Sequence, residues 1–85
     1  MKYRVLLERN AERDLNNLQP SIRQDIIRKV LHLQDNPRPQ GCKKLEGSAH
    51  NWRLRHGAYR ILYAIDDSSK TVYVYRIKHR KEAYR

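Results

Sequence analysis

The chain alternates between stretches in which apolar residues follow the spacing of a strand and stretches in which they follow that of a helix. Residues 3–7 (YRVLL) are rich in strand formers and precede a charged break, which predicts a short first strand. Ala11, Leu15 and Leu18 then recur at helical spacing after Asn10, a residue type typical of a helix N-cap. We therefore expect a strand followed by a first helix of two to three turns.

A second helix is predicted between Pro20 and Asn36. Pro20 suits the first helical position, where a missing amide costs nothing, and apolar residues recur every three or four positions from Ile22 to Leu33. Pro37 disfavours helical geometry in the residue before it, so the helix must end near Asn36. The two helices are expected to pair in antiparallel fashion, with a joint apolar stripe that needs a sheet to cover it.

The remainder of the chain has the character of strands. A very short strand is expected at 44–46 within a loop-rich passage, and residues 51–55 alternate between apolar and polar side chains. Residues 58–65 and 71–77 are more apolar, as expected of interior strands. The order predicts a single α+β domain over residues 1–85, β-α-α-β-β-β, with two N-terminal helices packed on one face of a mostly antiparallel four-stranded sheet.

Charge narrows the classes of partner. The 85 residues include 19 Lys and Arg against 9 Asp and Glu, a net charge of +10, and so basic a small body attracts phosphate polymers. Nucleic acid or the ribosome is therefore favoured over a membrane surface or an acidic protein alone. The single cysteine, Cys42, cannot form an internal disulfide, and no apolar run is long enough for a signal peptide or membrane span. We expect a cytoplasmic protein.

The candidate chemistry rests on arginine. The sequence contains no Gly-rich phosphate loop, paired carboxylates or spaced Cys/His set, so no metal or cofactor is expected. Cationic, imidazole and phenol side chains instead gather at or near the ends of the last three strands. They are Arg53, Arg55, Arg60, His79, Arg80 and Tyr84. Each also has a structural interpretation, as the wet face of a strand or as a tail packed on the core. Arg60 fits that interpretation least well, because it lies inside the most apolar strand.

Such a set is suited to cleavage of RNA. The neighbouring 2'-hydroxyl is the nucleophile once a base takes its proton, so the protein must stabilise the extra charge on the phosphate and protonate the leaving 5'-oxygen. Arg grips phosphate oxygens in its planar fork, but it stays charged and is a poor base. Proton transfer is therefore expected from His79 or Tyr84, and the choice between them stays open.

Three stretches carry a resemblance to a known family: NPRPQGCKKLEG, WRLRHGAYRILYAI and VYVYRIKHRKEAY. Over nearly its whole length the chain resembles the RelE/ParE toxin superfamily of bacterial toxin-antitoxin systems. The resemblance implies two N-terminal helices against a four-stranded sheet, as expected above. Within that superfamily RelE-like members cleave mRNA in the ribosomal A site, whereas ParE-like members poison DNA gyrase. The sequence looks like the RelE-like mRNA interferase branch.

The resemblance implies roles for individual residues. Arg53 and Arg55 match the alternating basic pair of RelE-like enzymes, and Arg60 the basic member of a Tyr-Arg pair. Arg80 matches a late catalytic arginine and Tyr84 the C-terminal tyrosine. The best known members have Lys at the alternating pair, so phosphate stabilisation carries over but proton transfer by a neutral lysine does not. Arg80 and Tyr84 are also closer together in the sequence than the matching residues of those members. The final helix of those members is not expected here. His79 is accordingly expected to share or take the acid/base role.

The expected function is therefore that of a type II toxin, a metal-independent endoribonuclease that cleaves mRNA in the A site of the ribosome and inhibits translation. The alternatives are a non-catalytic ParE-like inhibitor of gyrase and a plain RNA-binding module. An acidic antitoxin is the implied partner, and operator DNA is expected to be bound only through the complex of toxin and antitoxin. The residues expected to meet ribosomal RNA are Lys43, Lys44, Arg23, Arg28 and Lys29.

Overall fold

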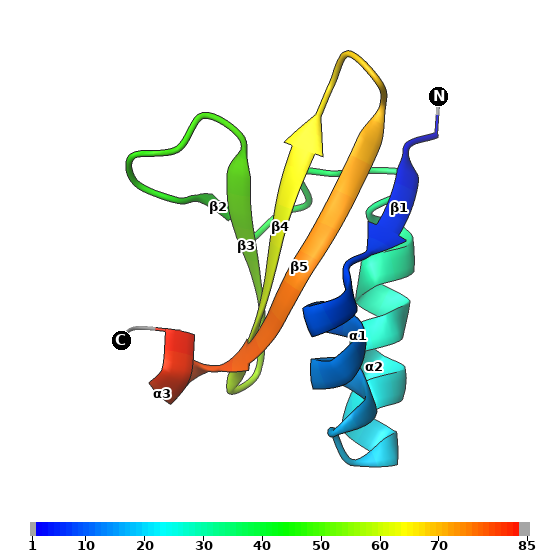
Figure 1. The fold of residues 1–85 in the computed structure, drawn as a ribbon, viewed down its shortest axis with the longest axis vertical. Coiled ribbons are helices and arrows are strands. Elements are labelled where there is room, and N and C mark those ends of the chain that lie inside the picture. Colours follow the sequence, from blue (N-terminus) through cyan, green and yellow to red (C-terminus); the bar gives the residue numbers. More distant parts are fainter. Residues whose placement is uncertain (1, 84–85) are drawn as a thin grey trace.

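Two helices cover one face of a five-stranded sheet in the computed structural model, which describes residues 2–83 (Figure 1). In chain order the elements are β1 (Arg4–Leu7), α1 (Arg9–Asn16), α2 (Pro20–His32), β2 (Lys43–Lys44), β3 (Asn51–His56), β4 (Tyr59–Asp66), β5 (Thr71–His79) and α3 (Arg80–Ala83). The predicted α+β class is confirmed, and the six predicted elements occur in the predicted order as β1, α1, α2, β3, β4 and β5.

The sheet has the order β1-β5-β4-β3-β2. Only β1 and β5 run parallel; the other neighbours are antiparallel. Strands β4 and β5 are interior, as their apolar sequences predicted. The fifth strand, beyond the four expected, is β2, which pairs with β3 through Lys43 and Lys44 rather than at 44–46. Beyond β2 the Leu45 N–H still donates to Asn51 O at 2.9 Å, and the chain then turns, with Ser48 N donating to Leu45 O at 3.4 Å.

The helix boundaries agree with the prediction at the start of α2 and differ from it elsewhere, since α2 ends at His32 rather than near Asn36. Helix α2 begins at Pro20, as predicted. Helix α1 begins at Arg9, so the prediction of Asn10 as N-cap was wrong. Glu8 takes that place because its N–H ends the β1–β5 ladder at Val74 O (2.9 Å) while its carbonyl accepts the Glu12 N–H (2.9 Å). A final helix was not expected, yet α3 forms one short turn after β5.

The core lies between the two helices and the sheet. It is a single cluster of buried side chains from α1, α2, β3, β4 and β5. The members are Ala11, Leu15, Ile26, Val30, Leu33, Leu54, Ile61, Tyr63, Ile65, Val72, Val74 and Ile77. Successive side chains of a strand point to opposite faces of the sheet, so the residues next to Leu54 and Ile61 point away from the helices. Packing of the core thereby directs Arg53, Arg55 and Arg60 onto the uncovered face.

Helix α1 closes the edge of β5 where β1 ends. The Asp14 carboxylate accepts the Ile77 N–H at 2.9 Å and binds the Arg76 guanidinium through Nε (2.8 Å) and Nη2 (3.2 Å). A register shift in the pairing of β4 with β5 lies beside this contact, because Leu62 pairs with Arg76 but Tyr63 with Val74. A bulge of this kind bends the strand. Here the Asp14 carboxylate accepts a hydrogen bond from the exposed backbone N–H of Ile77.

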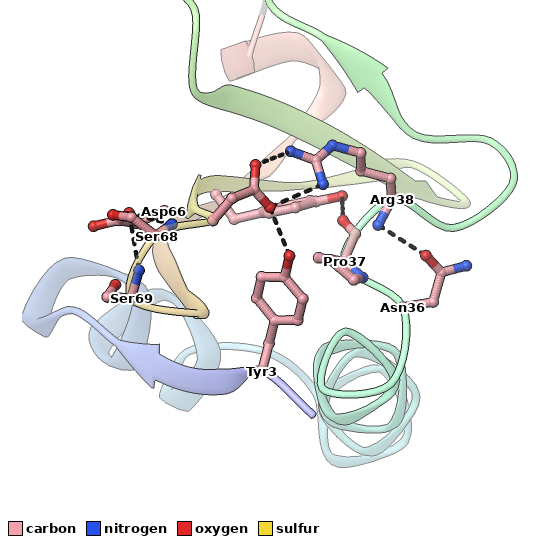
Figure 2. Close-up of polar contacts among 9 residues, drawn as sticks. Tyr3, Asn36, Pro37, Arg38, Asp66, Ser68 and Ser69 are labelled. Carbon is pink, nitrogen blue, oxygen red and sulfur yellow. Dashed lines mark hydrogen bonds and ion pairs between the residues drawn. The ribbon is translucent and has the colours of Figure 1, made fainter. Parts of the chain in front are cut away.

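An ion pair at the other end of the sheet joins three distant segments (Figure 2). The Asp67 carboxylate, in the β4–β5 turn, binds Arg38 Nη2 at 2.7 Å and accepts a hydrogen bond of 2.6 Å from the Tyr3 hydroxyl. Arg38 also lies 5.2 Å from the centre of the Trp52 ring. The hydrogen bonds from Arg38 and then Tyr3 lower the pKa of Asp67 to about 2. The cluster ties the loop after α2 to the β4–β5 turn and to the start of β1.

The pH dependence of stability tests this cluster. Because the folded-state pKa of Asp67 is depressed below its usual value of 3.8, its contribution is complete above about pH 4 and is lost as pH falls through about 2. We expect Asp67→Asn to lower the melting temperature at neutral pH, and the difference from the parent to shrink toward pH 2. Thermal unfolding followed by circular dichroism across this range measures it.

Asp35→Asn is the matched control, since Asp35 is exposed and makes a longer ion pair with Lys2 (3.8 Å). It is expected to change the melting temperature less than Asp67→Asn. Equal losses for the two variants at neutral pH would contradict the importance given to the Asp67 cluster.

Candidate functional site

A small pocket lined by cations lies on the uncovered face of the sheet. Its lining residues are Gly41, Lys43, Arg53, Arg55 and Arg60, and its volume is about 90 Å³. Lys43 pairs with Arg53 across β2 and β3, and Arg55 with Arg60 across β3 and β4. In the described part of the chain no carboxylate lines this pocket. Its size and charge suit a single phosphate group, which these cations would bind through charge-assisted hydrogen bonds.

Cations stand side by side across three strands at this place. Arg55 on β3 pairs with Arg60 on β4, and Arg60 pairs in turn with Lys78 on β5. Like charges directly opposite each other destabilise a sheet, and Arg60 is only 4% exposed. A bound anion would offset that repulsion. Lys78 was missed from the sequence, although its position next to the core residue Ile77 already placed it on the uncovered face.

The two-residue turn between β3 and β4 positions these arginines. Gly57 has a φ of +56°, which favours glycine, and its carbonyl accepts hydrogen bonds from Arg60 Nη1 (3.1 Å) and Arg55 Nε (3.4 Å). Arg60 Nη1 also donates to Tyr59 O at 3.0 Å. The next carbonyl, of Ala58, accepts the Arg80 N–H at 2.6 Å where α3 begins. One turn therefore holds three of the predicted site arginines.

The structure does not bring His79 into the pocket. His79 pairs with Tyr59, and the two rings meet edge to face with their centres 5.4 Å apart. Tyr59 packs against the core, so this pair lies on the helix-covered side of the sheet, opposite the arginines. His79 Nδ1 accepts the Lys81 N–H at 3.3 Å, which leaves the proton of a neutral ring on Nε2. Arg80 is exposed and does not line the pocket, and Tyr84 lies outside the described residues.

The residues expected to meet ribosomal RNA separate into different surfaces. Lys43 lines the arginine pocket, whereas Lys44 pairs with Trp52 on the edge strand. Arg28 and Lys29 line a larger cleft of about 490 Å³ between α2 and β3. Arg28 also binds Asp25 at 3.2 Å, and Arg23 is half-buried on the same helix. Sequence reasoning thus missed that Lys43 belongs with Arg53, Arg55 and Arg60, because that proximity depends on the pairing of β2 with β3.

Among residues 2–83, no group of three or more His, Cys, Asp or Glu side chains is arranged to hold a metal ion. No helix in the same part of the chain is long and apolar enough to cross a membrane.

Comparison with known proteins identifies the class. Residues 5–84 match the sequence model of the family described as the ParE toxin of the type II toxin-antitoxin system, parDE, so the chain belongs to this family and is a toxin of a type II system. Toxin RelG of Mycobacterium tuberculosis is 35% identical over 86 residues, which cover 100% of this chain and 99% of RelG.

Solved structures narrow the assignment within the family. The toxin-antitoxin complex RelBE2 of Mycobacterium tuberculosis matches with a TM-score of 0.82 and 33% identity, covering 93% of this chain and 99% of the matched one. The archaeal RelE–RelB complex of Pyrococcus horikoshii matches with a TM-score of 0.84 and 26% identity, covering 94% and 97%. The chain therefore belongs to the RelE-like branch of the RelE/ParE superfamily.

The turn between β3 and β4 can be tested directly. Gly57→Val places a β-branched side chain at a positive φ, which forces the turn to change and moves the carbonyl that holds Arg55 and Arg60. We expect the NMR signals of both guanidinium groups to shift and the affinity for inorganic phosphate to fall by roughly tenfold, since hydrogen bonds to charged groups contribute about that much.

Gly47→Val is the matched control. Gly47 also has a positive φ, of +75°, but it lies in the loop between β2 and β3 and does not line the pocket. The same strain there is expected to leave the arginine signals and phosphate affinity unchanged. Similar losses from both variants would show that Gly57 affects general stability rather than the arginines.

Proposed function

We propose that this toxin is a ribosome-dependent endoribonuclease that cleaves mRNA in the A site without a metal ion. The observation that carries the proposal is the pocket in which Arg53, Arg55, Arg60 and Lys43 surround a space fit for one phosphate. The 2'-oxygen of the preceding ribose attacks the phosphorus, the bond to the 5'-oxygen breaks, and the products end in a 2',3'-cyclic phosphate and a 5'-hydroxyl.

Charge stabilisation is the part of this reaction that the pocket supplies. The pentavalent phosphate gains negative charge as the new bond forms, and fixed guanidinium groups need little reorganisation to meet it. The carbonyls of Gly57 and Tyr59 hold Arg60 in place before substrate binds. Arg80, tied to the same turn through its backbone, is proposed to reach the phosphate or the leaving oxygen from the start of α3.

Proton transfer is proposed for Tyr84 or His79. The position of His79 on the helix-covered side, in contact with Tyr59, favours a supporting role in which it orients the first turn of α3. Tyr84 follows Arg80 by four residues in the sequence and is the remaining candidate among those predicted.

The partners proposed for the toxin follow its relatives and its charge. Structures of RelE toxins in complex with RelB antitoxins have been solved. We propose that an acidic antitoxin likewise binds this chain, and that the complex of the two binds operator DNA. Lys44, Arg23, Arg28 and Lys29 are proposed to contact ribosomal RNA, with the cytoplasm as the place of action. These exposed and half-buried cations lie on surfaces separate from the arginine pocket.

Cleavage of mRNA on programmed ribosomes tests the function. Arg55→Ala is expected to slow single-turnover cleavage by roughly 100-fold or more, as loss of one group that stabilises transition-state charge does in other enzymes. Arg55 is exposed, so this variant should fold normally. Arg13→Ala, which removes an exposed arginine of α1 outside the pocket, is the control and should cleave at the parental rate.

Expression of the parent toxin in bacteria, with mapping of mRNA 5' ends, separates the proposal from its alternatives. New 5' ends within translated codons are expected. Growth arrest with intact transcripts and a DNA-damage response would identify a gyrase inhibitor and overturn the nuclease. Growth without arrest would leave a plain RNA-binding module.

The assignment of the acid and base can be decided from pH–rate profiles. Tyr84→Phe removes only a hydroxyl, and His79→Gln removes the imidazole while keeping a polar side chain. If Tyr84 transfers the proton, Tyr84→Phe should remove one limb of the plot of single-turnover cleavage rate against pH. His79→Gln should then change the height of that plot but not its shape. Loss of a limb in His79→Gln alone would reverse the assignment.

A further inference from the structure

The proposed cleavage reaction makes no use of the cleft between α2 and β3. This cleft has a volume of about 490 Å³, and two of its walls are formed by Asp25, Arg28, Lys29 and His32 of α2 and by Leu54 and His56 of β3. The four α2 residues are three or four positions apart, so they form one face of the helix. We call this cavity the α2–β3 cleft.

The character of the lining changes from the mouth of the α2–β3 cleft to its floor. The Arg28 side chain is 67% exposed, which places its charge at the mouth. Farther in, the side chain of Asp25 is 47% exposed and that of His56 is 30% exposed. Leu54 is only 5% exposed and forms the floor. The cleft therefore has a cationic mouth, a polar middle with an imidazole ring, and an apolar floor.

Asp25 connects the helix to the strand across this cleft. Its carboxylate binds Arg28 Nη1 at 3.2 Å and lies 3.7 Å from Nε2 of His56. A carboxylate at this depth repels a bare anion, but it accepts hydrogen bonds from N–H groups. The lining thus suits a ligand that brings N–H donors into the cleft and keeps negative charge at the mouth.

The loop after α2 forms the third wall, through Pro39 and Gln40, and it is held in place by the protein itself. The hydroxyl of Tyr63, a fully buried residue, donates to Pro37 O at 2.9 Å. The Cys42 N–H donates to Pro39 O at 3.1 Å and closes a turn. A cleft whose walls are already ordered loses less entropy when a ligand enters.

We propose that the α2–β3 cleft binds one unpaired nucleotide of RNA, with the base inside and the phosphate at the mouth. Proteins bind unstacked bases by stacking flat side chains, histidine included, on their faces and by hydrogen bonds to their edges. The ring of His56 is placed to stack on the base, and Asp25 and Gln40 to meet its edge. Arg28 and Lys29 then bind the phosphate.

The α2–β3 cleft and the arginine pocket lie on opposite faces of the sheet. Leu54 and His56 alternate along β3 with Arg53 and Arg55, which line the pocket. The nucleotide in the cleft is therefore not the one whose phosphate is cleaved. It belongs either to the ribosomal RNA or to another part of the mRNA, and both offer the same chemistry. This inference rests on the RNA partner of the proposed function but not on cleavage.

Titration of the free toxin with small phosphates tests the cleft. The four nucleoside 5'-monophosphates, ribose 5-phosphate and inorganic phosphate are added separately, and the imidazole NMR signals of His32 and His56 are followed. At least one nucleotide is expected to shift both signals and to bind roughly tenfold or more tightly than ribose 5-phosphate, since stacking of one base contributes about that much.

Two results of this titration would overturn the proposal. One is equal affinity for ribose 5-phosphate and for all four nucleotides, or shifts confined to the arginine pocket. The other concerns an acidic protein as occupant, for which polyglutamate is the probe. If polyglutamate shifts the two imidazole signals and the nucleotides do not, the cleft binds protein rather than RNA.

Substitutions of His56 test its stacking role. His56→Ala is expected to raise the dissociation constant of the tightest nucleotide by roughly tenfold, read from the His32 signal. His56→Phe keeps a flat ring and should retain most of the affinity. His50→Ala is the matched control, because His50 is exposed and does not line the cleft, and it should bind as the parent does. Equal weakening by His56→Phe and His56→Ala, or by His50→Ala, would contradict stacking.

Binding to ribosomes distinguishes the two sources of the nucleotide. The dissociation constants of the parent and of His56→Ala are compared on ribosomes whose A-site codon carries 2'-deoxyriboses, which prevents cleavage, and on ribosomes whose mRNA ends at the P site. Weakening of roughly tenfold on both identifies ribosomal RNA as the source. Weakening only where a codon is present identifies mRNA. No weakening on either would overturn the proposal.

The same ribosomes separate this inference from the proposed function. A parent toxin that binds them, yet leaves an all-ribose codon intact, would overturn the nuclease but not the nucleotide site. A parent toxin that does not bind ribosomes at all would overturn the proposed function, and the nucleotide titration would then decide the α2–β3 cleft by itself.

Discussion

The alternation of side chains along β3 and β4 is the constraint on which the rest of the structure depends. Leu54 and Ile61 point into the core beneath the two helices, and this fixes the opposite direction for Arg53, Arg55 and Arg60. A shift of one residue in register would exchange the two sets, burying cations and exposing the core. Stability of the fold and construction of the site are therefore consequences of the same pairing.

The sheet concentrates charge at one end and apolar surface at one edge. Cations stand opposite one another across β3, β4 and β5, where pairing forces Arg55, Arg60 and Lys78 into proximity. At the β1 edge, Leu7 and Leu31 border a groove and a free strand. Like charges placed opposite one another and apolar side chains open to solvent are both less favourable than paired or covered ones.

Contacts between distant segments hold this arrangement together with few residues. Asp67 joins Tyr3 to Arg38, and Asp14 closes the exposed end of β5. The turn at Gly57 and Ala58 holds two guanidinium groups and the first amide of α3. In a chain of 85 residues with a small core, such polar ties supply order that burial of apolar surface alone does not.

The sequence by itself determined the local elements and the faces of the strands. Apolar spacing predicted both helices, Pro20 predicted the start of α2, and alternation at 51–55 separated the core residue Leu54 from its arginine neighbours. These features depend on residues near one another in the chain, where periodicity and proline geometry act directly. The family resemblance, carried by the motifs around Arg60 and Arg80, could be recognised for the same reason.

Only the tertiary structure decided which of these side chains meet. It placed Lys43 in the pocket and His79 on the other side of the sheet. It made Glu8, where the pairing of β1 with β5 ends, the N-cap of α1 in place of Asn10. It also left the outer edge of β1 open. Each outcome depends on strand register and on contacts between residues far apart in sequence. Local spacing carries no information about such contacts, because they arise when the chain closes on itself.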